Sequence, residues 1–217
     1  MKMKKFMKKF YFSKKEIIHL VFAALAISFA FEFVLFNKQI FSPNFSLALL
    51  IKLFLEAFLI IAFAFILHEL GHKFVAQYFG VWAEFRAWPF GLILAIALAL
   101  VSRGGFVFAA PGAVVILPVK KTSRGYLFKK LSKKQIGYIG IVGVLINIVL
   151  ASIFLLLAHI LSLAFAALAA QINAWLAIFN LIPLSVLDGA KVWYWSKGAW
   201  TAVMITAISL FVLILLL

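Results

Sequence analysis

The chain has 217 residues, of which 67% are hydrophobic and only 12% are charged. This composition is too apolar for a soluble domain of this length and indicates an integral membrane protein. Cysteine is absent, which excludes both a disulfide framework and a thiolate metal site. Any bound metal ion would therefore need ligands from His, Asp or Glu.

The positive charge of the chain, +15 in total, is concentrated in two clusters. Seven lysines lie within residues 1–15, and seven lysines and arginines lie within residues 120–134. Short basic segments stay on the cytosolic side of a membrane, so both clusters, and the N terminus with them, are expected to face the cytosol and its anionic lipid headgroups. The clustering argues against nucleic acid as the partner. The first apolar run is about long enough to span and no small-residue cleavage site follows it, so no cleaved signal peptide is expected.

The first half of the chain predicts two spanning helices. Residues 16–36 form the first, and a short polar turn on the outer side follows. Residues 45–79 form the second, which at 1.5 Å per residue measures roughly 50 Å and exceeds a bilayer core of about 30 Å. Gly80 suits the left-handed conformation that ends a helix. The polar cluster in "HELGH", residues 68–72, then lies inside the membrane, toward its cytosolic side.

The middle of the chain predicts a re-entrant element. Residues 89–101 are apolar but too short to span, and are typical of a segment that enters and leaves on one side. Two β-rich runs follow, 106–108 and 114–117, and between them Pro111 and Gly112 suit a type II turn. The pattern predicts a hairpin. Strand edges cannot face lipid, so the hairpin is expected beside the polar cluster.

The remainder predicts three further spans, and so fixes the expected fold class. That class is an all-α polytopic membrane protein with about five to six transmembrane helices and a re-entrant β-hairpin next to the active site. The whole chain, 1–217, is expected to form one membrane-embedded domain with a catalytic core at about 45–191. The three later spans are predicted at residues 135–158, 161–182 and 198–217.

The "HELGH" motif predicts a hydrolytic metal site. His68 and His72 are four residues apart, so both imidazoles project from one helix face and can bind one zinc ion. Glu69 lies beside them, close enough to reach a water molecule without binding the metal. Zinc lowers the pKa of a water molecule to near 7, and Glu69 can accept its proton as general base. Ionisable groups inside a membrane are costly, so three of them among five consecutive residues of a span indicate a functional site.

A catalytic zinc ion needs a third protein ligand, and few carboxylates are available. After the motif, the only carboxylate residues in the chain are Glu84 and Asp188. Glu84 comes just after the helix stop and is poorly placed to turn back toward His72. Asp188 is better placed, because a spanning helix ends just before it on the same side of the membrane and Pro183 and Gly189 break the helix there. Asp188 is therefore the favoured third ligand, with Glu84 as the alternative.

With "HELGH" and "NLIPLSVLDG" together, the sequence resembles the site-2 protease family of intramembrane zinc metalloproteases over about residues 56–191. In that family a segment N-x-x-P-x-x-x-x-D-G supplies the third ligand, and Asn180, Pro183, Asp188 and Gly189 match its spacing. The resemblance implies one zinc ion, hydrolysis of peptide bonds in or near transmembrane segments, a transmembrane-protein substrate and a β element that holds the substrate as an added strand.

The resemblance also extends to a Gly-Pro-x-x-Asn element, with departures. "GVLIN" matches it at Gly143 and Asn147, but Val144 replaces the proline. By resemblance, Asn147 would bind the substrate or its oxyanion; the alternative is a polar contact between helices. Segment 89–101 is an insertion relative to the family pattern, and residues 185–186 lack the proline that the family often has there. These departures leave the choice of substrate open.

Two other functions compete with intramembrane proteolysis. Membrane zincins of the prenyl-protein or heat-shock type take a downstream glutamate as third ligand, and no glutamate follows Glu84. A non-proteolytic zinc-binding or metal-transport protein is the second alternative. A transporter would carry ligands along a path, whereas here they are concentrated at one depth, and a purely binding site has little need for Glu69. The expected localisation is a multi-pass cell membrane protein with its active site toward the cytosol.

Overall fold

The computed structural model describes residues 12–108, 110–117, 119–122 and 125–217. The predicted lysine cluster at positions 2 to 9 lies outside these residues. Among the described residues, five helices are long and apolar enough to cross a membrane, which confirms the expected helical, polytopic class. They are α1 (Lys14–Leu35), α3 (Leu47–Tyr78), α5 (Lys133–Leu161), α6 (Ala164–Leu181) and α8 (Lys197–Leu216).

Serine caps and one glycine set the ends of these spans. Four of the five begin after a serine whose hydroxyl accepts a hydrogen bond from a backbone N–H three residues on; these are Ser13, Ser46, Ser132 and Ser196. Such caps satisfy amide groups that the helix cannot pair itself. Gly80 has a φ of 73°, as expected for the residue that ends α3.

Three short helices connect the spans. The helix α2 (Asn37–Ile40) lies in the turn between α1 and α3, and α7 (Asp188–Trp195) lies between α6 and α8. The apolar segment predicted as a short intramembrane piece is the 13-residue helix α4 (Pro89–Val101), which packs on α1. Its return to one side of the membrane stays a prediction.

The predicted hairpin was right in one strand and wrong in its partner. Strand β2 (Gly112–Leu117) contains the expected run 114–117, but it pairs antiparallel with β1 (Trp82–Ala87). Residues 106–108 have no regular structure. The Pro111–Gly112 pair therefore does not join two strands. Instead, α4 and the loops on either side of it connect β1 to β2. The backbone N–H of Trp88, just after β1, donates to the carbonyl of Pro111, just before β2, at 2.8 Å.

The strand β1 was missed because its sequence, "WAEFRA", alternates rather than forming an apolar run. Ala83 and Phe85 are buried against the helices, whereas Glu84 and Arg86 point to the other face, where Glu84 is also buried and Arg86 is half-buried. Burial on one face and polarity on the other is typical of an antiparallel sheet with one covered face. A second ribbon, β3 (Val119–Thr122) with β4 (Gly125–Phe128), lies in the basic segment and was not predicted.

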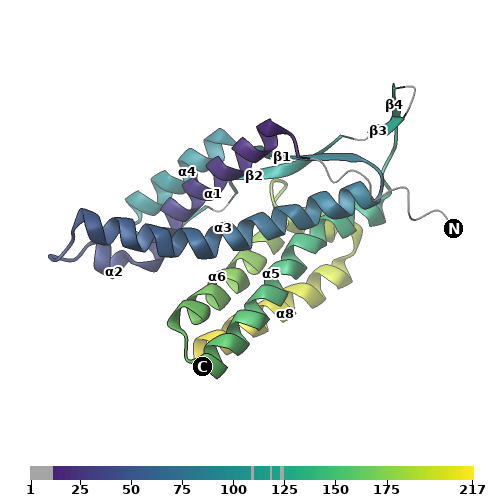
Figure 1. The fold of residues 1–217 in the computed structure, drawn as a ribbon. Helices are drawn as coiled ribbons and strands as arrows, with labels where there is room; N and C mark the ends of the chain where they lie inside the picture. Colours follow the sequence, from purple (N-terminus) through teal and green to yellow (C-terminus); the bar gives the residue numbers. More distant parts are fainter. Residues whose placement is uncertain (1–11, 109, 118, 123–124) are drawn as a thin grey trace.

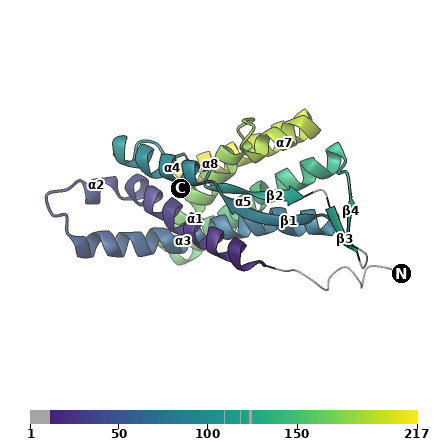
Figure 2. The ribbon, with the colours of Figure 1, turned by 90° about the horizontal axis from the view of Figure 1, so that it is seen from above.

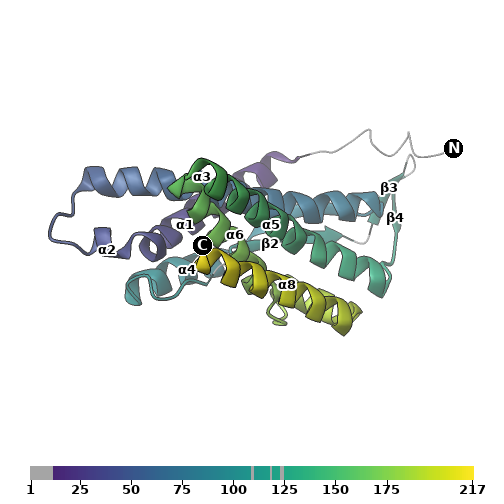
Figure 3. The ribbon, with the colours of Figure 1, turned by 90° about the horizontal axis from the view of Figure 1, so that it is seen from below.

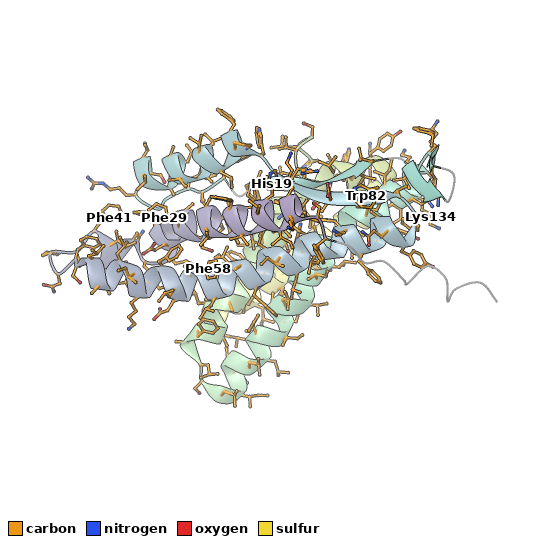
Figure 4. All side chains as sticks on the ribbon, turned by 45° about the horizontal axis from the view of Figure 1, so that its top comes forward. His19, Phe29, Phe41, Phe58, Trp82 and Lys134 are labelled. Atoms are coloured by element: carbon orange, nitrogen blue, oxygen red, sulfur yellow. The ribbon has the colours of Figure 1, made fainter. Side chains whose placement is uncertain are left out.

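The helices form two groups that meet at α3. Helices α1 and α4 lie with α3 in the first group, and α5, α6 and α8 cross beneath it (Figure 1). The sheet β1–β2 lies over α1 and the C-terminal half of α3 (Figure 2), and α5 and α8 cover the opposite side (Figure 3). Figure 4 shows His19 of α1 beside β1, where its Nδ1 accepts the backbone N–H of Ala87 at 3.1 Å. The "HELGH" turn of α3 thus lies between the sheet and α5.

Candidate metal centre

The three predicted metal ligands lie close together in the structure, although 120 residues separate the first from the last in sequence. His68 and His72 come from α3, and Asp188 is the first residue of α7. The two Nε2 atoms are 2.9 Å apart, and Asp188 Oδ2 lies 3.1 Å from His68 Nε2 and 2.8 Å from His72 Nε2. All three side chains are buried, with at most 6% of each residue exposed.

Hydrogen bonds behind the two imidazoles fix which nitrogen faces the centre. His72 Nδ1 donates to the backbone carbonyl of Ile139 on α5 at 2.5 Å. His68 Nδ1 lies 2.5 Å from the Oδ1 of Asn147, also on α5. A proton on each Nδ1 leaves a lone pair on each Nε2. Two lone pairs and a carboxylate oxygen therefore converge on one point, which is the arrangement of a candidate metal site.

The donor set and the spacing fit zinc. Two imidazole nitrogens and one carboxylate are a ligand set found in catalytic zinc sites, in which the fourth position stays open. Bonds of about 2.0 to 2.1 Å in a tetrahedron place ligand atoms about 3.3 Å apart. The three separations of 2.8 to 3.1 Å need only a small outward movement to reach that spacing.

Gly143 makes the space for this centre. A Cβ built at this position would lie 2.5 Å from His72 Nε2 and 2.7 Å from His68 Nε2, closer than real Cβ contacts. Any side chain at position 143 would occupy the point on which the ligand atoms converge. The absence of a side chain on this face of α5 thus gives the two histidines their room.

Glu69 lies at the centre without binding to it. Its residue is buried and its Oε2 has no hydrogen-bond partner among the described residues. Buried carboxylate oxygens are normally paired, and an unpaired one beside a set of metal-ligating side chains is free to bind a water molecule. Glu69 lines the same cavity as the ligands, which has a volume of about 40 Å³ and is large enough for water. The arrangement is the one expected of a base that acts on a water molecule.

Asp188 is held as a carboxylate by two different partners. Lys191 Nζ donates to its Oδ1 at 2.7 Å, which leaves Oδ2 to face the histidines. Burial alone would raise the pKa of Asp188, but the positive charge of Lys191 acts against this and favours the carboxylate. Glu84, the alternative ligand, lies on β1 instead and forms an ion pair with Arg86.

The structure places Asn147 behind His68, fully buried, with its amide group already bonded. Its Oδ1 contacts His68, and its Nδ2 donates to the Oδ1 of Asn173 on α6 at 3.0 Å. These contacts orient His68. They also join α5 to α3 and α6, which agrees with the alternative prediction of a polar contact between helices. A direct contact of Asn147 with substrate stays a prediction.

Sequence reasoning missed three residues that support the centre: Ile139, Asn173 and Lys191. Asn173 had a signal, because a lone asparagine inside a spanning helix is expected to bond across to another helix. Ile139 had none, since it contributes only a backbone carbonyl. Lys191 lies three residues after Asp188, a spacing that brings two side chains together on a helix.

Comparison with known proteins gives one close relative. The chain is 38% identical over 200 residues to a protein of Methanocaldococcus jannaschii named "Putative zinc metalloprotease", and the match covers 89% of this chain and 91% of that one. No protein-family model and no solved structure matches the chain. Identity at this level over nearly the full length of both proteins shows common descent, and the chain therefore belongs to the family of the archaeal protein that carries this name.

Proposed function

We propose that this chain is an intramembrane zinc metalloprotease of the site-2 protease type, which hydrolyses peptide bonds in or near the transmembrane segments of other membrane proteins. The observation that carries the proposal is the convergence of three buried acceptor atoms beside an unpaired glutamate, with both histidines and the glutamate on a helix long enough to span. The name of the archaeal relative agrees with it.

The residues of the chain divide the chemistry among them. His68, His72 and Asp188 would hold one zinc ion, which supplies a water molecule of lowered pKa and polarises a carbonyl. Glu69 accepts the proton of the attacking water and returns a proton to the leaving amine. Asn147 and the Ile139 carbonyl keep the imidazoles in the tautomer that the centre needs.

The strand β2 is proposed to hold the substrate. Among the described residues β2 pairs only with β1, which leaves its second edge unpaired. Residues 110–114 line the catalytic cavity together with Glu69, so the start of this strand lies beside the centre. A transmembrane helix shields its own peptide bonds and must unwind before hydrolysis. An unpaired strand edge can then satisfy the exposed backbone groups of the unwound segment.

The orientation in the membrane is part of the same proposal. The two basic clusters would lie at the cytosolic face against anionic headgroups, which places the centre nearer to the cytosol. The substrate would be a transmembrane protein that reaches the centre from the bilayer.

The test is cleavage of a membrane-anchored reporter by purified protein in vesicles. Replacing the base, Glu69→Gln, is expected to lower kcat by a factor of about 10² to 10⁴ while bound zinc is retained. Glu56→Gln is the matched control, because Glu56 lies on the same helix but is partly exposed and pairs with Lys52 at 3.9 Å. Cleavage that survives Glu69→Gln, or wild-type protein that binds zinc yet cleaves no reporter, would overturn the proposal.

A further inference from the structure

A second cavity adjoins the catalytic one. It has a volume of about 370 Å³ and lies on the outer face of the β1–β2 sheet, against the segment that leads into α7. The two cavities share five lining residues; these are Ala110, Gly112, Ala113, Val186 and Lys191. A peptide in the first cavity would therefore extend side chains into the second.

The charged residues that line this second cavity are all cationic. Arg86 and Lys191 contribute them, Ser185 adds a hydroxyl, and no acidic residue is among the lining residues. The side chains of Arg86 and Lys191 are 34% and 32% exposed, so both reach the cavity while being held from behind. Glu84 holds the first and Asp188 the second.

Arg86 has a hydrogen-bond donor to spare. Its Nη2 donates to Glu84, but its Nη1 is buried and has no partner among the described residues. A guanidinium carries five N–H donors, and a buried donor without an acceptor is unfavourable by about 1 to 3 kcal/mol. The exposed third of the Arg86 side chain lines the cavity, so an acceptor that enters there would meet a guanidinium with donors left over, and a carboxylate pairs best with a guanidinium.

The register of the sheet determines which substrate residues could supply the acceptor. Arg86 lies opposite Ala113 and Glu84 opposite Val115, so these four side chains share the outer face. A substrate strand added to the unpaired edge of β2 alternates its side chains in the same way. Only every second substrate residue, the one opposite Ala113 or Val115, would point into the second cavity.

We propose that this second cavity is a specificity pocket that accepts an acidic side chain of the substrate close to the cleaved bond, with Arg86 as its anchoring donor. The inference rests on the proposed protease function and names a feature of its substrates.

The experiment is a scan of one reporter with wild-type protein. The reporter is a single apolar span interrupted by a short Gly-Ala segment, in which each alanine in turn is replaced by Asp, Asn or Lys. Asp is expected to raise kcat/KM about ten-fold over Ala at one position, the gain of a charge-assisted hydrogen bond. The neighbouring positions on either side are expected to give no such gain, because their side chains face the other way.

Variants then assign the selectivity to Arg86. The Asp-to-Ala ratio of kcat/KM is expected to fall to about one in Arg86→Gln and to survive in part in Arg86→Lys. A ratio within one variant is independent of how much of that variant folds. Arg103→Gln is the matched control, because Arg103 is exposed and lines neither cavity; its ratio is expected to equal that of wild type.

The outcomes separate the two proposals. Cleavage of every reporter with equal kcat/KM, or a preference for Asp that persists in Arg86→Gln, would overturn the specificity pocket and leave the protease function standing. Cleavage of no reporter by wild-type protein would overturn the protease function and the pocket with it. A cavity occupied by lipid phosphate would give the first of these results, a flat scan.

Discussion

The ligand atoms of the centre are positioned by groups that lie behind them on α5. His72 is fixed by a backbone carbonyl and His68 by an asparagine that is itself bonded to α6. Partners of this kind typically contribute a factor of about 10 to 100 in metal affinity. The motif "HELGH" therefore names the ligands, while the precision of the site comes from residues 67 to 79 positions further along the chain.

Gly143→Ala should remove zinc binding with little effect on the fold. Its Cβ would lie 2.5 Å from His72 Nε2, inside the space that the ligand atoms enclose, so the two histidines could no longer converge. We expect at least a ten-fold loss of zinc affinity, measured by competition with a chelator. Gly198→Ala is the control, because the nearest atom to its Cβ would be 4.0 Å away. Equal zinc affinity in both variants would contradict the geometry of the centre.

At the scale of elements, a buried ion pair joins the sheet to the catalytic helix. Glu16 at the start of α1 pairs with Lys73, which directly follows His72 on α3, and both are 1% exposed. The second oxygen of Glu16 accepts the backbone N–H of Phe85 in β1 at 3.0 Å. One carboxylate thus ties together α1, α3 and β1 beside the centre.

Glu16→Gln should destabilise the protein strongly, because it removes the carboxylate charge that faces Lys73 within a buried ion pair. Breaking a buried pair in this way lowers the free energy of unfolding by about 3 to 5 kcal/mol. Thermal unfolding in detergent measures it as a lower Tm. The exposed pair Lys52–Glu56 provides the comparison, and its loss through Glu56→Gln should cost under about 1 kcal/mol. Similar shifts of Tm in the two variants would refute the role given to Glu16.

The spans and the meeting of His68, His72 and Asp188 were predictable from sequence, whereas the sheet was predictable only in half. Long apolar helices follow from composition, and two histidines four residues apart must share a helix face whatever surrounds them. The strand β1 was not predicted because Glu84 and Arg86 interrupt its apolar pattern. Of these two residues, Arg86 lines the second cavity. Pairing between strands separated by α4 depends on tertiary packing that no local pattern encodes.

At the scale of the whole molecule, the proposed orientation places the opposite ends of the fold on the two sides of the membrane. The short helix α2 lies at one end and the ribbon β3–β4 at the other (Figure 1). The proposed orientation places the β3–β4 end in the cytosol and α2 outside. Exposed lysines mark both ends: Lys38 in α2, and Lys134 near the start of α5 (Figure 4).

Cysteine labelling tests this orientation without interference, because the natural chain contains no cysteine. In intact cells a membrane-impermeant thiol reagent should label Lys38→Cys and leave Lys134→Cys unlabelled until the membrane is opened. The positive-inside rule is the physical basis of the expectation. The opposite pattern would reverse the proposed orientation while leaving the centre itself unaffected.

The central claim is that His68, His72 and Asp188 form one zinc site, and its most direct test is the zinc content of the purified protein. Elemental analysis should find about one zinc per chain in wild type and in Glu69→Gln, because Glu69 does not bind the metal. In Asp188→Ala the content should fall well below one under the same chelator wash. Zinc that is absent from wild type, or unchanged by Asp188→Ala, would contradict the account.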